Sequence, residues 1–262
     1  MKLTLIQGDC LKILPKLKSE SVDLVVTDPP YNLGNKFNKL IRGGKIGNKF
    51  NRNLVNTLLD FDNFENEEQY ISFLTNVFDE MNRVCKKDAN FVTFIDWRYL
   101  SLVIKELEKR GWKFRNVFAW VKQNPCPQLR KCNFAQGLEL AVWMSRGKNT
   151  FNYQLGHQPN YVVCPLNDTA YHPTQKHIDV VKTLIKYLSN ENDTVLDPFL
   201  GSGTTMKACL ELNRNCIGIE IDPKYIKIAK ERLNWGYSLG NVKFEFLTEK
   251  EIEKWMKERI TL

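Results

Sequence analysis

The residues that build metal centres and disulfide frameworks are scarce in this sequence. Its 262 residues include three histidines and seven cysteines, and no two cysteines are spaced as a CxxC pair. Structural zinc sites need such ligands close together. An odd number of cysteines also disfavours a framework of disulfides. We therefore expect no metal site, and cysteines that stay reduced.

Long apolar runs are absent as well. A membrane-spanning helix needs roughly 18 or more consecutive apolar residues, and no segment approaches that length. The apolar run at the beginning of the chain is too short for a secretory signal peptide, so we expect an intracellular protein. Hydrophobic residues make up 43% and charged residues 26% of the chain. That balance excludes intrinsic disorder.

Acidic residues are too few to balance the basic ones. There are 38 lysines and arginines against 30 acidic residues, which gives a formal net charge of +8. A basic chain favours an anionic partner such as nucleic acid. Residues 32–59 contain no acid, and we expect a basic, flexible loop there. Its six cations are Lys36, Lys39, Arg42, Lys45, Lys49 and Arg52.

A second basic stretch, residues 109–148, has Glu139 as its only acid. Its cations, Arg130 and Lys131 among them, are expected to contact phosphates. Such contacts would make nucleic-acid binding dependent on salt.

Short β-branched runs alternate with segments of helical periodicity along most of the chain. We expect strands at 3–7, 22–28, 90–97, 112–121, 138–144, 194–199, 216–221 and 242–246. Helices are expected at 11–17, 67–85, 100–110, 177–189, 205–212, 223–233 and 248–258. The alternation predicts one α/β domain over residues 1–262, with a doubly wound, mostly parallel sheet covered by helices on both faces. Residues 145–171 lose the periodicity and are expected to form a small loop-rich insert.

Two predicted strands end in an Asp-Pro dipeptide, and the first of these is followed by an aromatic residue. Asp28, Pro29, Pro30 and Tyr31 come directly after a buried apolar run. The two prolines fix the backbone and leave carbonyl groups free to accept hydrogen bonds. A carboxylate, a fixed carbonyl and an aromatic face suit a planar ring that carries an amino group. The alternative is a turn that only caps the strand.

The second Asp-Pro dipeptide opens a glycine-rich turn at 197–205 that leads into a helix. Gly201 and Gly203 let the backbone approach a ligand closely, and the helix N-terminus offers it N–H groups. The turn matches neither the GxGxxG fingerprint nor a P-loop. Glu220 ends the next strand and can hold the two hydroxyls of a ribose. Together these features predict a nucleoside-bearing cofactor; the alternative is that Glu220 only caps the turn before Asp222.

Four motifs in one order carry a resemblance to a known family. DPPY at 28–31, HPTQK at 172–176, DPFLGSGTT at 197–205 and GIEIDPKYIKIAKERL at 218–233 resemble the β class of amino-methylating DNA methyltransferases of restriction–modification systems. The catalytic motif precedes the cofactor glycines, as in that circularly permuted class. GDC at 8–10 resembles the opening of such chains. The resemblance implies a Rossmann-like methyltransferase fold and a place in the cytoplasm of a prokaryotic cell.

The resemblance also implies S-adenosylmethionine as the cofactor, bound on the glycine-rich turn with its ribose on Glu220. Asp197 and Thr204 would line the methionine end, where Lys176 would pair with the carboxylate. The expected cofactor-binding residues are Asp9, Asp28, His172, Thr174, Lys176, Asp197, Phe199, Gly201, Ser202, Gly203, Thr204, Thr205, Glu220 and Asp222.

For catalysis the resemblance implies direct transfer of a methyl group to a base flipped out of duplex DNA. Asp28 and the Pro29 carbonyl would each accept one N–H bond from the exocyclic amine, while Tyr31 stacks on the base. Enzymes of this class that methylate cytosine N4 more often have serine in place of the aspartate, so Asp28 favours the N6 of adenine. Cytosine-N4 methylation is the nearest alternative. A nucleic-acid-binding protein without activity and an RNA or protein methyltransferase are alternatives of other classes.

Double-stranded DNA is the expected partner. The insert 145–171 carries polar and aromatic side chains able to read base edges, and we expect it to recognise the target sequence. A cognate restriction endonuclease and a second copy of the chain in a homodimer are further expected partners.

Overall fold

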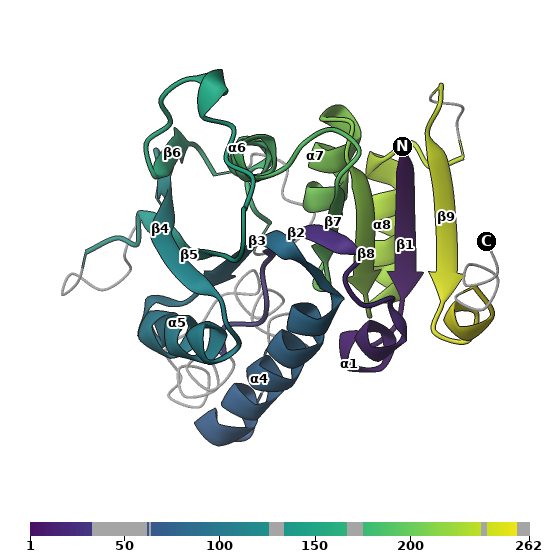
Figure 1. The fold of residues 1–262 in the computed structure, drawn as a ribbon, viewed down its shortest axis with the longest axis horizontal. Coiled ribbons are helices and arrows are strands. Elements are labelled where there is room, and N and C mark those ends of the chain that lie inside the picture. Colours follow the sequence, from purple (N-terminus) through teal and green to yellow (C-terminus); the bar gives the residue numbers. More distant parts are fainter. Residues whose placement is uncertain (33–61, 63, 126–133, 167–174, 237–239, 256–262) are drawn as a thin grey trace, which may run out of the picture.

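The computed structural model describes residues 1–32, 62, 64–125, 134–166, 175–236 and 240–255. Within these ranges nine strands form one sheet in the order β6-β4-β5-β3-β2-β7-β8-β1-β9 (Figure 1). Neighbouring strands run parallel except around β5, which is antiparallel to both β3 and β4. The strands are β1 (Lys2–Gln7), β2 (Val22–Thr27), β3 (Cys85–Ile95), β4 (Lys113–Lys122), β5 (Leu138–Ser145), β6 (Tyr161–Cys164), β7 (Thr194–Asp197), β8 (Asn215–Glu220) and β9 (Lys243–Thr248).

Helices cover both faces of this sheet. They are α1 (Cys10–Ile13), α4 (Glu67–Val84), α5 (Leu100–Lys109), α6 (Ile178–Leu188), α7 (Thr204–Glu211) and α8 (Pro223–Arg232). Short 3-10 turns follow at η1 (Leu14–Lys16), η2 (Trp97–Tyr99) and η3 (Tyr153–Leu155). In Figure 1, α1, α4 and α5 lie on one side of the strands, and α6 and α7 lie on the other.

Two hydrophobic cores follow from this arrangement, one on each face. Side chains from α1, α4 and α5 fill the first core, and those from α6, α7 and α8 fill the second. Successive strand residues point to opposite faces, so in β2 Val25 packs into the first core while Leu24 and Val26 pack into the second. Strands buried on both faces read as continuous apolar runs. The predicted doubly wound α/β sheet is confirmed.

The expected elements and the observed ones differ most at three places. Strand β3 begins at Cys85, before the expected start at 90. Its first residues include Lys86, Lys87 and Asp88, which are exposed, so the apolar pattern that marked the strand in the sequence starts later than the strand itself. Residues 145–171, expected to be loop-rich, contain β6, which pairs in parallel with β4. Of the expected helix at 248–258, residues 252–255 are helical and the last residues lie outside the described ranges.

The topology brings the two Asp-Pro turns together. Strands β2 and β7 are neighbours in the sheet and run parallel, although they lie far apart in sequence. Their carboxyl ends therefore meet at one edge, where doubly wound sheets bind ligands. No helix in the described ranges combines the length and the apolar character that crossing a membrane requires.

Candidate functional site

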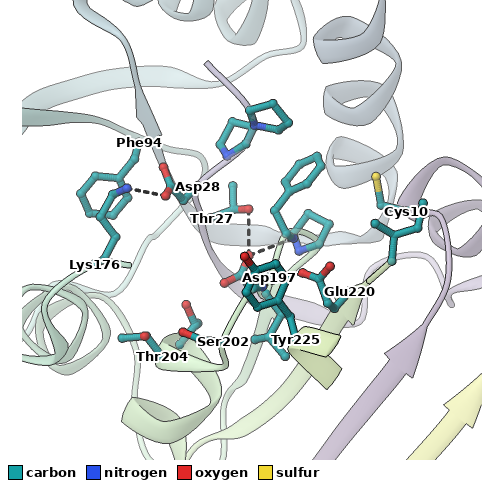
Figure 2. A pocket seen from close by; sticks show the side chains of 18 of the residues that line it. Cys10, Thr27, Asp28, Phe94, Lys176, Asp197, Ser202, Thr204, Glu220 and Tyr225 are labelled. Atoms are coloured by element: carbon teal, nitrogen blue, oxygen red, sulfur yellow. Dashed lines mark hydrogen bonds and ion pairs between the residues drawn. The ribbon is translucent and has the colours of Figure 1, made fainter. Parts of the chain in front are cut away.

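A cavity of about 500 Å³ opens at the carboxyl ends of β2, β7 and β8 (Figure 2). Its volume is in the usual range for small-molecule and cofactor sites. In Figure 2, Lys176 and Phe94 lie at one end, with Asp28, and Glu220 and Cys10 lie toward the other. We call these the amine end and the ribose end, after the groups that the sequence predicts there.

The turn from Asp28 to Tyr31, predicted to be catalytic, is held rigidly at the amine end. The Tyr31 hydroxyl donates a hydrogen bond of 2.6 Å to Oδ1 of Asp28. The Tyr70 hydroxyl, from α4, donates to the Pro30 carbonyl at 2.8 Å. The Pro29 carbonyl has no donor among the described residues, and Pro29 lines the cavity. The turn therefore places the Asp28 carboxylate and Pro29 together at the cavity.

A buried ammonium contacts the carboxylate of that turn. Lys176, whose side chain is 5% exposed, forms an ion pair with Oδ2 of Asp28 and a second, at 3.0 Å, with Oε2 of Glu139. Its Nζ also lies 5.3 Å from the centre of the Tyr31 ring and 5.1 Å from that of Phe94. Such contacts stabilise a cation that has left water.

The charges at this end perturb one another. Burial raises the pKa of Asp28, and Lys176 offsets part of that effect. Burial alone would lower the pKa of Lys176, but Asp28 and Glu139 outweigh it and the pKa is raised. Lys176 is therefore charged at neutral pH. The pKa of Glu139 is lowered because Lys176 and Lys122 outweigh its own burial.

The end of β7 supplies a second buried carboxylate. Asp197 accepts hydrogen bonds from the Thr27 hydroxyl at 2.9 Å and from the Phe199 amide at 3.1 Å. Burial raises the pKa of Asp197 to about 6 despite these donors. Phe199 and Phe73 of α4, with ring centres 5.9 Å apart, form part of an apolar wall of the cavity.

Glu220 organises the ribose end. Its Oε2 accepts the amide of Gly201 at 2.8 Å, and its Oε1 accepts the amide of Asp222 at 2.8 Å. An ionised carboxylate has about four acceptor positions, so Glu220 keeps capacity for ligand hydroxyls while it holds the turn. This geometry fits the ribose of a nucleoside cofactor.

The glycine-rich turn is fixed from α8. Gly203 adopts φ +85°, and a Cβ there would lie 3.0 Å from that of Ala229, so a larger residue fits poorly. The Arg232 guanidinium donates to the carbonyl and hydroxyl oxygens of Ser202, at 2.6 and 2.9 Å, and to the Thr204 hydroxyl at 3.2 Å. These contacts orient the first turn of α7 toward the cavity.

Most of the predicted site residues come together. The predicted residues that line the cavity are Asp9, Asp28, Pro29, Pro30, Tyr31, Lys176, Asp197, Phe199, Gly201, Ser202, Thr204, Thr205, Glu220 and Asp222. The carboxylates of Asp9 and Asp222 also cap α1 and α8. Gly203 shapes the turn without lining the cavity. His172, Thr174, Arg130, Lys131 and the six cations from Lys36 to Arg52 lie outside the described residues.

The sequence did not reveal Glu139 as part of the site, although it is the only acid in a basic stretch. It also did not reveal Phe64, Phe73 and Tyr225, which line the cavity. Glu139, Phe64 and Phe73 sit in segments without a recognisable motif, whereas Tyr225 lies within the motif at 218–233, to which the resemblance assigned no role for this residue. In the described part of the chain no group of three or more His, Cys, Asp or Glu is placed to hold a metal ion.

Known proteins share this sequence pattern. The profile of the DNA methylase family matches residues 22–231. The type II methyltransferase M2.LlaDCHI of Lactococcus lactis subsp. cremoris is 31% identical over 252 residues, which cover 90% of this chain and 91% of that protein. The type II methyltransferase M.HpaI of Haemophilus parainfluenzae is 31% identical, over 89% of this chain and 75% of that protein.

Solved structures share the fold. The complex of M1.HpyAVI with SAM superposes with a TM-score of 0.67 at 27% identity, covering 88% of this chain and 99% of that one. The cytosine-N4-specific PvuII DNA methyltransferase gives a TM-score of 0.69 over 99% of this chain and 94% of its own. At 18% identity, that second likeness concerns the fold alone.

Proposed function

We propose that this chain, which belongs to the DNA methylase family and is an S-adenosylmethionine-dependent DNA methyltransferase, methylates the exocyclic N6 of adenine. The observation that carries the choice of base is the Asp28 carboxylate, fixed at the cavity between the Tyr31 hydroxyl and the Lys176 ammonium. A carboxylate there accepts an N–H bond from an amine more strongly than a neutral serine hydroxyl would.

The ribose end suits the cofactor. Glu220 would hold the ribose hydroxyls, and the turn from Gly201 to Thr205 would face the cofactor with its backbone. The apolar wall of Phe73 and Phe199 would cover its planar ring. When bound, S-adenosylmethionine supplies a methyl group on a positively charged sulfur, which is a strong electrophile.

The amine end then acts on the base. Asp28 and the Pro29 carbonyl each accept one N–H bond from the amine, and Tyr31 stacks on the flipped ring. Both acceptors are fixed, so the nitrogen lone pair is aimed at the methyl group. The amine would gain the methyl group from the bound cofactor, whose carbon–sulfur bond would break, and it would then lose one proton. Asp28, which would accept one of its N–H bonds, would take that proton.

DNA would approach from the side of the sheet where the carboxyl ends of β2 and β7 lie. The catalytic turn leads directly into residues 32–59, whose cations would contact phosphates. The segment 145–171, which includes η3 and β6, would read the target sequence. We also propose that the protein acts in the cytoplasm beside a cognate restriction endonuclease, and that it forms a homodimer, which sedimentation would test.

The test is methylation of unmodified duplex DNA with radiolabelled S-adenosylmethionine, followed by digestion to nucleosides. We expect the label in N6-methyladenine, and no label with Asp28→Asn at unchanged cofactor affinity. Label in N4-methylcytosine would refute the choice of base and keep the catalytic turn. Full activity of Asp28→Asn would refute the role of the turn itself.

A further inference from the structure

We infer that Glu139 is a positioning residue for methyl transfer: it shares the Lys176 ammonium with Asp28. Asp28 therefore keeps negative charge for the target amine. The inference rests on the proposed role of Asp28. Glu139 does not line the cavity, so it acts through Lys176.

The direction of β5 puts Glu139 at the site. Because β5 is antiparallel to β3 and β4, it begins where those strands end, and its second residue, Glu139, lies opposite Trp120 near the end of β4. From there Oε2 reaches the Lys176 ammonium at 3.0 Å and Oε1 reaches Nζ of Lys122 at 2.6 Å. Lys122 in turn lies 5.2 Å from the centre of the Trp120 ring. Glu139 is thus held from behind and directed at Lys176.

Three ion pairs link four groups of alternating charge, in the order Asp28, Lys176, Glu139 and Lys122. An ammonium that served Asp28 alone would neutralise it and would oppose the positive charge that the amine gains during transfer. Since Lys176 is shared between two carboxylates, Asp28 retains more of its charge. That charge stabilises the transition state, where fixed electrostatics have their largest effect.

The other groups that face Asp28 do not replace Glu139. The Tyr31 hydroxyl donates to the carboxylate but carries no charge, and the Phe94 ring faces Lys176. Asp197, from β7, is a further acid that interacts with Asp28, and no ion pair joins it to Lys176 among the described residues. Among these groups, Glu139 of β5 is the one that shares the ammonium with Asp28.

The decisive variant is Glu139→Gln, which keeps the size and removes the charge. We expect the single-turnover rate at saturating cofactor and DNA to fall roughly ten- to hundredfold, as for the loss of a charged contact. Cofactor affinity, measured by calorimetry, should change less than twofold. Glu139 raises the pKa of Asp28. In Glu139→Gln the acid limb of the pH–rate profile should therefore move to lower pH. The Asp28 carboxyl should shift in the same direction when it is titrated by NMR without cofactor.

Glu245→Gln is a matched control. Glu245 lies in β9, its side chain is 18% exposed like that of Glu139, and it pairs with Lys2 at 2.5 Å. Its loss should cost similar stability and leave the rate and its pH profile unchanged. Lys122→Met provides a second test: it frees Glu139 to bind Lys176 more closely, so the acid limb should move to higher pH.

The inference is overturned if Glu139→Gln behaves like Glu245→Gln, or if its defect is confined to DNA affinity. A shift of the acid limb to higher pH in Glu139→Gln would also overturn it, since Glu139 would then only hold Lys176 in place. An active Asp28→Asn would refute the proposed catalytic role together with this inference. An inactive Asp28→Asn beside an unaffected Glu139→Gln would refute the inference alone.

Discussion

The substitution Lys176→Met tests how strongly the buried ammonium supports the fold around the amine end. It leaves two carboxylates, Asp28 and Glu139, facing each other with side chains 21% and 18% exposed. Removing one partner of a buried ion pair costs about 3–5 kcal/mol, and the partial exposure of both acids favours the lower value. For a chain of 262 residues, roughly 3 kcal/mol lowers Tm by about 10 °C.

The pH dependence gives the sharper test of Lys176→Met. Without the cation, burial and mutual repulsion raise the pKa of both acids in the folded state. The variant is then most stable below the ordinary carboxyl pKa, and it loses stability as the pH rises through the raised values. We therefore expect calorimetry to show a smaller fall in Tm at pH 5 than at pH 8. An equal fall at both pH values would refute the electrostatic reasoning.

The control for this experiment is Lys109→Met, in α5. Lys109 is 69% exposed and pairs with Glu106 at 2.6 Å. An exposed pair of this kind contributes about 0–1 kcal/mol, so Tm should hardly change at either pH. A fall as large as that of Lys176→Met would show that burial is not what distinguishes the two lysines.

Three further predictions concern the cofactor, the pH dependence of stability and the DNA. Glu220→Ala removes the acceptor of the Gly201 and Asp222 amides. Calorimetry should show S-adenosylmethionine binding at least tenfold weaker, as for a lost charged hydrogen bond of roughly 1.5 kcal/mol or more. Unchanged affinity would show that Glu220 does not bind the cofactor. Asp197 has its pKa raised from 3.8 to about 6, so it stabilises the fold below pH 4 and loses that contribution, on the order of 3 kcal/mol, as the pH rises to 6. Denaturant titrations of Asp197→Asn should lack this slope, and an unaltered slope would assign it to other groups. Neutralising the cations from Lys36 to Arg52 should flatten the salt dependence of DNA binding, whereas an unchanged slope would exclude residues 32–59 from the interface.

The parts of the site that the sequence predicted are those whose chemistry is local. Asp28 and Asp197 each stand at the end of an apolar run, and the rule for doubly wound sheets places both at one edge before any coordinates are known. Glu220 follows from the same rule. In each case a short motif, its strand and its position in the sheet agree.

The parts that the sequence did not predict depend on pairing between distant segments. Glu139 joins the site only because β5 runs against its neighbours, and nothing in its flanking residues indicates that direction. Strand β6 has four residues and pairs at one border of the sheet, so its pattern is too short to distinguish from a loop. Short strands gain most of their order from their partner.

The reversed strand also divides the protein into two parts that can change separately. In the proposed function the cofactor lies at the ends of β7 and β8, whereas β4 ends and β5 begins at the same edge on the other side of β2. On that proposal, a change of sequence between β4 and β5 leaves the strands that hold the cofactor in place. Such a chain could acquire a new target sequence while its methyl-transfer chemistry stays the same.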